Sequence, residues 1–195
     1  MKNISKKAFG QIILFLLFIN FQNCKVQESN QSLKIADFEF TSIFGINTND
    51  YINQYCLLGS GYFRAPRSEN SDSLIIDWLN IHPRARVVPV STVKSSDSNG
   101  NNTNMVYCWV IDKEDTLNNY LIKNGAYPGE TMVRPQTWDE LETWKKATYQ
   151  GRDKKANVEV YIDNKTYETF IEQIKTAELY ARNKKLGIWE KALSE

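Results

Sequence analysis

The sequence predicts an α+β domain in which strands come first and helices dominate the end of the chain. Residues 34–112 contain alternating or continuous apolar stretches separated by Gly-, Ser- and Asn-rich turns, which is typical of β-strands. Residues 164–186 carry apolar side chains at i, i+3, i+4 and i+7, which is typical of an amphipathic helix. No internal repeat interrupts this order, so one α+β domain is expected.

Five strands are expected, and they cover residues 34–44, 51–58, 87–93, 105–112 and 158–162. The first two are separated by the predicted turn G-I-N-T-N-D at 45–50. Pro89 indicates a sheet edge or a bulge, because proline cannot donate to the strand ladder. Segment 105–112 is almost continuously apolar and is therefore predicted to be central, whereas 95–104 is predicted to be an exposed loop.

Four helices are expected, at 71–80, at 116–125, after the T-W-D-E stretch and at 164–186. Thr137 and Glu140 have the spacing of a capping box, which predicts a helix start. Gly125 and Gly187 have the position of helix-ending glycines. Just past Gly187, Trp189 is a bulky apolar residue, so the chain is expected to fold back there onto the rest of the domain.

The N-terminus has the pattern of a secretory signal. Three lysines (Lys2, Lys6 and Lys7) precede an apolar run at 12–19, which is too short for a bilayer-spanning helix of roughly 20 residues. Cys24 follows, and a polar tether comes after it. This arrangement resembles a bacterial lipoprotein signal, which implies cleavage before Cys24 and acylation of its thiol. The alternative is an ordinary secretory signal with an incidental cysteine.

The lipoprotein interpretation divides the chain into a signal peptide at 1–23, a tether at 24–34 and a domain at 35–195. It predicts a monomer in the bacterial cell envelope, outside the cytoplasm, that contacts the lipid bilayer through acylated Cys24. The whole chain has 24 Lys and Arg against 23 Asp and Glu, and removal of the leader's lysines makes it slightly acidic. Overall charge therefore gives no general attraction to nucleic acid, although a local basic groove remains open.

Cys56 and Cys108 are the cysteines outside the leader region. Outside the cytoplasm such a pair suggests a disulfide, which would close a loop of about 50 residues and stabilise by about 4 kcal/mol. Two buried thiols are an equal alternative, because cysteine is a common core residue. With His82 as the one histidine, these residues do not form a zinc constellation.

Two stretches carry a resemblance to a known family. Residues 110–127, V-I-D-K-E-D-T-L-N-N-Y-L-I-K-N-G-A-Y, and 177–189, A-E-L-Y-A-R-N-K-K-L-G-I-W, resemble the staphylococcal-type nuclease (thermonuclease) family. The matching residues of the first stretch are Leu117, Asn118, Leu121, Lys123 and Gly125. The resemblance implies an OB-fold, a five-stranded β-barrel with packed helices and a C-terminal amphipathic helix, with an insertion at about 128–163.

The family hydrolyses phosphodiesters with Ca²⁺, and that chemistry needs carboxylates for the metal and the attacking water, and arginines for the phosphoryl charge. This sequence departs from the pattern. Cys56 and Met105 fall where the two arginines belong, and Gly61 falls where a metal aspartate belongs. The glutamate position holds Arg64, or Glu69 if the loop is longer. We therefore expect catalysis to be lost, and Ca²⁺ to bind only if nuclease activity is retained.

An active nuclease or phosphodiesterase with relocated residues is one alternative. Its catalytic candidates are Arg64, Arg67 and Glu69, and its metal-ligand candidates are Asp50 and Asp112. For each of these residues the sequence favours the alternative of a solvated loop with ordinary ion pairs.

The sequence favours a binding module over an enzyme. The loop Y-F-R-A-P-R at 62–67 places aromatic rings beside arginines, which suits single-stranded nucleic acid. A third possibility is an envelope-protein interaction module. Its contacts would be the helix bearing Trp138 and Trp144 and the basic segment Lys145–Lys155, although tryptophans are more often core than interface.

Overall fold

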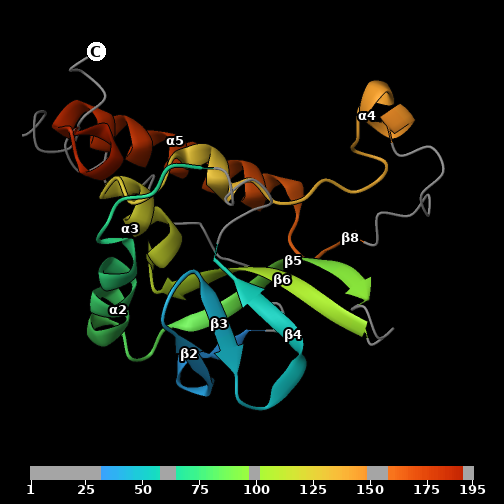
Figure 1. Ribbon diagram of the computed structural model, residues 1–195, viewed down its shortest axis with the longest axis horizontal. Coiled ribbons are helices and arrows are strands. Elements are labelled where there is room, and N and C mark those ends of the chain that lie inside the picture. The colour runs from blue at the N-terminus through green and yellow to red at the C-terminus, as the bar shows by residue number, and fades with distance from the viewer. Residues whose placement is uncertain (1–31, 58–64, 97–101, 149–157, 191–195) are drawn as a thin grey trace, which may run out of the picture.

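The computed structural model describes residues 32–57, 65–96, 102–148 and 158–190. The chain forms a mixed, strongly curved sheet that is nearly closed into a barrel, with helices packed on it (Figure 1). The predicted α+β class is therefore confirmed. Among the described helices, none has both the length and the apolar character needed to cross a membrane.

The sheet has the strand order β1-β5-β6-β4-β3-β2. Its strands are β1 (Leu33–Lys34), β2 (Phe38–Phe40), β3 (Phe44–Asn47), β4 (Asp50–Cys56), β5 (Arg86–Ser96) and β6 (Asn102–Asp112). All neighbouring pairs on this path are antiparallel except β4 and β6, which are parallel. Because only the short 3-10 turn η2 (Ile35–Asp37) separates β1 from β2, the two ends of the path adjoin and the sheet curls back on itself.

Two short strands extend the sheet. β7 (Asp115–Thr116) pairs with the end of β6, and β8 (Val158–Val160) pairs with β5 at residues 91–93. The side chains of Lys94 and Glu159 form an ion pair across the β5–β8 contact. The register of β5 against β6 shifts between Pro89 and Ser91, so the bulge predicted at Pro89 is confirmed.

The N-terminal hairpins differ from the prediction. Residues 45–50 were expected to form a turn, but residues 44–47 form β3, and the turn narrows to Thr48 and Asn49. Gly45 makes this strand fit, because a Cβ there would stand 2.3 Å from the ring of Phe40. The contact joins paired residues of one hairpin, and the alternation of apolar and polar residues gave no signal for it. In the same way, β5 and β6 reach residues 96 and 102, into the stretch predicted as a loop.

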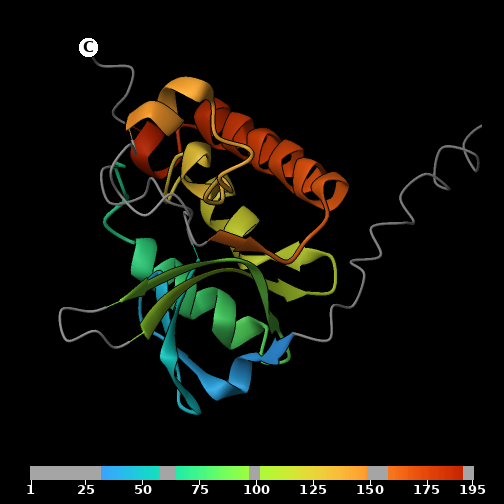
Figure 2. The same ribbon diagram turned by 90° about the vertical axis from the view of Figure 1, so that its right-hand side faces the viewer.

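The helices are α2 (Ser71–Ile81), α3 (Leu117–Lys123), α4 (Thr143–Thr148) and α5 (Asn164–Lys184), with 3-10 turns η4 (Gly129–Met132) and η5 (Gly187–Trp189). In Figures 1 and 2, α3 lies between the sheet and α5. Thr116 caps α3 by accepting a hydrogen bond from the Asn119 N–H at 3.0 Å, and Asp163 caps α5 by accepting one from the Thr166 N–H at 2.9 Å.

The predicted capping box forms without its helix. The Thr137 N–H donates to the Glu140 carboxylate at 2.8 Å, but residues 138–140 form a turn, and α4 begins only at Thr143. β6 is central, as predicted. Cys108 and Val110 are buried on one face, and on the other Trp109 stacks on Phe170 of α5 at 4.2 Å between ring centroids.

α3 and α5 are joined at their C-terminal ends by two glycines. Gly125 and Gly187 have φ of 67° and 54°, in the left-handed region that favours glycine. The Ile188 N–H donates to the Gly125 carbonyl at 2.9 Å. A Cβ on Gly187 would stand 2.2 Å from the Gly125 oxygen, and a Cβ on Gly125 would stand 2.1 Å from the Leu186 oxygen. The chain past α5 therefore folds back onto the domain as the sequence predicted.

We expect Gly187→Ala to lower the free energy of unfolding by about 3 kcal/mol, because it combines left-handed strain with a clash against backbone. Chemical denaturation measures this loss. The matched control is Lys185→Gly, since Lys185 also has a positive φ of 55° but is exposed. That change relieves strain and is expected to be neutral or stabilising by up to about 1 kcal/mol. Equal losses for the two variants would contradict the predicted backbone clash.

Candidate functional site

Several predicted site residues lie outside the described part of the chain. They are the lipidation candidate Cys24, the loop residues Gly61, Tyr62 and Phe63, and the catalytic candidate Arg64. Their predicted roles stay predictions. The candidates that the structure places are Cys56, Met105, Asp50, Asp112, Arg67, Glu69 and Cys108.

Cys56, in place of the family's first arginine, ends β4 in the interior of the barrel. Its exposed fraction is 0%. The thiol of Cys108 is also buried and donates to the Cys56 carbonyl oxygen at 3.4 Å. Both cysteines are present as thiols, which is the second of the two alternatives drawn from the sequence. Burial raises the pKa of the Cys108 thiol well above its ordinary value, so this thiol stays protonated and inert at neutral pH.

Met105, in place of the second arginine, lies on β6 between β4 and β5. It pairs with Gln54 on one side and with Val93 on the other, and it packs against the apolar core. The nearby polar contact is structural, because the Asn104 amide donates to the Asn53 side-chain oxygen at 2.8 Å. Neither arginine position therefore offers a cation to a phosphate.

Asp50 is committed to the β3–β4 hairpin. Its carboxylate accepts hydrogen bonds from the Ile52 and Asn53 N–H groups at 3.2 Å each, from the Asn53 amide at 2.7 Å and from the Tyr55 hydroxyl at 3.1 Å. Burial raises the pKa of Asp50, but these hydrogen bonds outweigh it and the net pKa is lowered. Asp50 thus closes a turn.

Asp112 lies at the other end of the barrel. Its carboxylate contacts His82 Nδ1 at 2.9 Å, and the His82 ring stacks on Trp78 at 4.1 Å between centroids. His82 follows α2 and precedes β5. β4 and β6 run parallel from the Asn53–Asn104 pair, and Asp112 is at the far end of β6. At about 3.3 Å per residue, Asp50 and Asp112 are on the order of 25 Å apart.

Asp50 and Asp112 therefore cannot bind the same cation, because one cation cannot bridge that distance, and a metal-ligand role for either residue stays a prediction. Within the described ranges, no group of three or more His, Cys, Asp or Glu side chains is close enough to hold a metal ion. Ca²⁺ takes six to eight oxygen ligands. The described residues do not fit it.

Arg67 and Glu69 are exposed residues of the segment that leads into α2. This segment is tied to the end of α3, because the Ser68 N–H donates to the Ala126 carbonyl at 3.0 Å. Burial raises the pKa of the Tyr127 hydroxyl, while hydrogen bonds with Ser71 and Arg67 act in the opposite direction. The backbone beside Arg67 is thus tied to the end of α3, and the Arg67 side chain is open to solvent.

Arg134 is a buried charged residue that the sequence analysis did not single out. It lies inside the predicted insertion, is 7% exposed, and binds both Glu140 oxygens at 2.9 and 2.6 Å. Its guanidinium also lies 4.8 Å from the centroid of the Tyr167 ring. A cavity of about 10 Å³ adjoins Arg134, Cys108 and Asn118, and it is too small for a ligand. The sequence signal for this ion pair was the V-R-P stretch followed closely by T-W-D-E, because Glu140 both completes the turn and binds Arg134.

No protein-family profile matches this sequence, and no curated protein matches it either. The resemblance to thermonucleases therefore rests on the residues quoted above.

The Arg134–Glu140 ion pair predicts a pH dependence. The hydrogen bond from Arg134 is the main cause that lowers the pKa of Glu140 to about 2, from an ordinary 4.5. A lowered folded-state pKa contributes stability above pH 4.5 that is lost as pH falls toward 2. We expect Glu140→Gln to cost about 1–2 kcal/mol at pH 7, discounted because the Glu140 side chain is 35% exposed, and much less at pH 3.

Urea denaturation of the native chain and of Glu140→Gln at both pH values tests this. Glu172→Gln is the control, because Glu172 pairs with Lys175 on the open surface of α5 and should contribute little at either pH. An equal cost of Glu140→Gln at pH 7 and pH 3 would exclude the ion pair as its cause.

Proposed function

We propose that this chain is a lipid-anchored envelope protein whose thermonuclease-like OB domain binds a ligand without calcium-dependent hydrolysis. The observation that carries the proposal is the burial of Cys56. The position that supplies an arginine in the family is enclosed in apolar core here. A guanidinium cannot act on a phosphate from such a place.

The strand path supports the OB-fold part of the proposal. β2, β3 and β4 form an antiparallel meander, β4 joins β6 in parallel, and β5 leads back to β1. Counting β1 and β2 as one strand broken by a turn, this path has the five strands and the Greek-key crossover of an OB barrel. The helix α2 lies between β4 and β5 along the chain.

The structural contacts of the Asp50 and Asp112 carboxylates support the proposed loss of hydrolysis. Asp50 closes a hairpin, Asp112 binds His82, and the two lie at opposite ends of the barrel. A hydrolytic site needs a carboxylate, a water and a cationic group at one point. Neither Asp50 nor Asp112 has an arginine or a lysine among its described hydrogen-bond and ion-pair partners.

Single-stranded nucleic acid is the ligand that we propose. Arg67 is exposed, and it ends the Y-F-R-A-P-R stretch at 62–67, whose aromatic residues are of the type that stacks bases.

We expect the purified chain to bind a fluorescent oligo-dT with an affinity that falls as salt rises. Arg67→Ala should reduce the slope of log K against log salt by about 0.7, the value for one phosphate contact on a single strand. Arg84→Ala is the matched control, because Arg84 is exposed in the turn before β5. Melting temperatures of both variants exclude unfolding as the cause.

The same preparations test hydrolysis. Supercoiled plasmid should stay intact in Ca²⁺, Mg²⁺ and Mn²⁺. Cleavage that Arg67→Ala abolishes would establish a nuclease and overturn the proposal. Oligo-dT binding with no salt dependence, or none at all, would remove nucleic acid as the ligand.

One observation favours the second candidate, an envelope-protein interaction module. Trp144 on α4 is 63% exposed, against the expectation that it would be core. Lys145 lies 5.4 Å from its ring centroid, so the helix presents an aromatic and a cationic group together. Such a pairing is common at protein interfaces.

A photo-crosslinking phenylalanine is placed at position 144 and activated in intact cells. If α4 is an interface, we expect one discrete protein adduct, and its yield should not fall at high salt. The control position is Ile76 on α2, which is 44% exposed. Identical adduct patterns from the two positions would remove α4 as an interface.

A further inference from the structure

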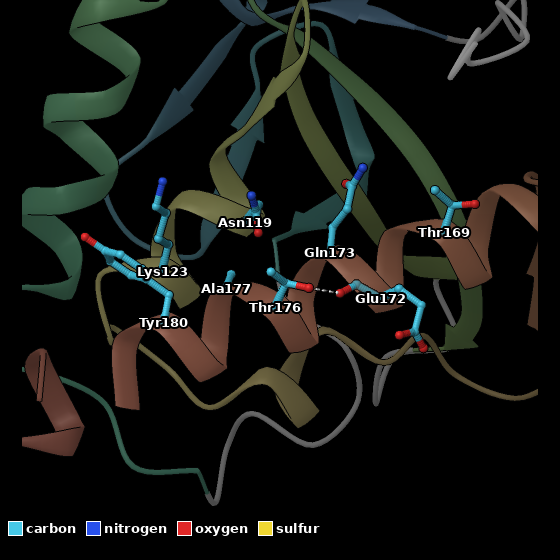
Figure 3. A pocket seen from close by; sticks show the side chains of 8 residues that line it. All are labelled: Asn119, Lys123, Thr169, Glu172, Gln173, Thr176, Ala177 and Tyr180. Carbon is cyan, nitrogen blue, oxygen red and sulfur yellow. Dashed lines mark hydrogen bonds between the residues drawn. The ribbon is translucent and has the colours of Figure 1, made fainter. Parts of the chain in front are cut away.

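A groove of about 660 Å³ runs between α3 and α5, and Arg67 is not among its lining residues. It is within the range of roughly 300–1,000 Å³ that is typical of small-ligand sites. Its lining residues, drawn in Figure 3, are Asn119, Lys123, Thr169, Glu172, Gln173, Thr176, Ala177 and Tyr180.

Two carboxamides in this groove are not used by the fold. The Asn119 side-chain oxygen is buried and accepts no hydrogen bond from the described protein. The Gln173 amide, on the facing helix, is exposed and likewise has no partner among the described residues. In Figure 3 the side chains of Lys123, Asn119 and Gln173 extend to the same side of the groove.

The other polar groups of the groove already have hydrogen-bond or ion-pair partners in the protein. The hydroxyls of Thr169 and Thr176 donate to backbone carbonyls one turn earlier in α5, each at 2.9 Å. Their oxygens can still accept a hydrogen bond. The Glu172 carboxylate pairs with Lys175 at 2.7 Å. What the groove offers to a ligand is therefore the exposed Gln173 amide, two hydroxyl acceptors and one lysine, whereas the Asn119 oxygen lies beneath the surface.

An aromatic ring closes one end. Tyr180 is 44% exposed, and the Lys123 ammonium lies 5.3 Å from its ring centroid. An exposed ring beside uncommitted polar groups offers apolar contact and hydrogen bonds to the same ligand.

We propose that the α3–α5 groove binds a saccharide. A carboxamide both donates and accepts, which matches the hydroxyl groups of a sugar, and the Tyr180 ring matches the apolar face of a pyranose. An anion fits less well, because Lys123 is the one cation among the described lining residues and Glu172 opposes it.

The purified full chain is first screened on a glycan array of neutral, N-acetylated and acidic oligosaccharides. The strongest hit is then titrated by calorimetry. Gln173→Ala should weaken its binding about five- to tenfold through the lost hydrogen bonds. Tyr180→Ala should weaken it about tenfold, whereas Tyr180→Phe, which keeps the ring, should bind within about twofold of the native chain.

Asn183→Ala is the control, because Asn183 is exposed on the same helix and does not line the groove. It should bind like the native chain, and all variants should melt at similar temperatures. The proposal is overturned if no array sugar binds at millimolar concentration, or if Gln173→Ala and Tyr180→Ala bind as well as Asn183→Ala. It is also overturned if inorganic phosphate or an acidic peptide displaces the sugar at lower concentration. Since Arg67 takes no part, oligo-dT binding can fail while sugar binding succeeds, and the reverse.

Discussion

The buried side chain of Asn118 holds the point where the two parallel strands separate. Its amide nitrogen donates to the Leu57 carbonyl at 2.6 Å and to the Cys108 carbonyl at 3.2 Å, and its oxygen accepts from the Val110 N–H at 3.1 Å. Each of these backbone groups would cost about 1–3 kcal/mol if left unpaired in the core. Aspartate lacks the donor and leucine lacks both functions, so one carboxamide joins β4, β6 and α3.

The positions of α3 and α5 depend on this junction. Because Asn118 fixes the start of α3, it also fixes where α3 ends, and there Gly125 meets Gly187 with no room for a side chain on either. This contact positions the end of α5, while Trp109 and Phe170 position its middle. The groove between α3 and α5 takes its shape from these contacts, so a ligand site there would need no moving part. A preformed site loses little free energy to ordering when it binds.

Patterns of residue type and spacing correctly predicted the features that depend on neighbouring residues in the sequence. The capped ends of α3 and α5, the bulge at Pro89 and the central position of β6 all follow from residue type and spacing. Predictions failed where side-chain contacts between paired or folded-back segments decide the structure. Gly45 extends a strand only because the Phe40 ring lies over it, and Glu140 closes a turn without opening a helix while binding Arg134. Asp50 and Asp112 were grouped as metal ligands by residue type, and only the parallel pairing of β4 and β6 reveals their separation.

The residues that carry the family resemblance also hold this fold together. A sequence can therefore keep the resemblance without keeping the residues that catalysis needs. Asn118, Gly125 and Gly187 are constrained by packing and by backbone hydrogen bonds, and these constraints persist whether or not anything is hydrolysed. Cys56 and Met105 are constrained differently, because they fill apolar space. A single Cys56→Arg change would bury an unpaired charge at several kcal/mol and still lack carboxylate partners. Under the proposed function, the groove and the exposed Arg67 would bind a ligand with the side chains already present.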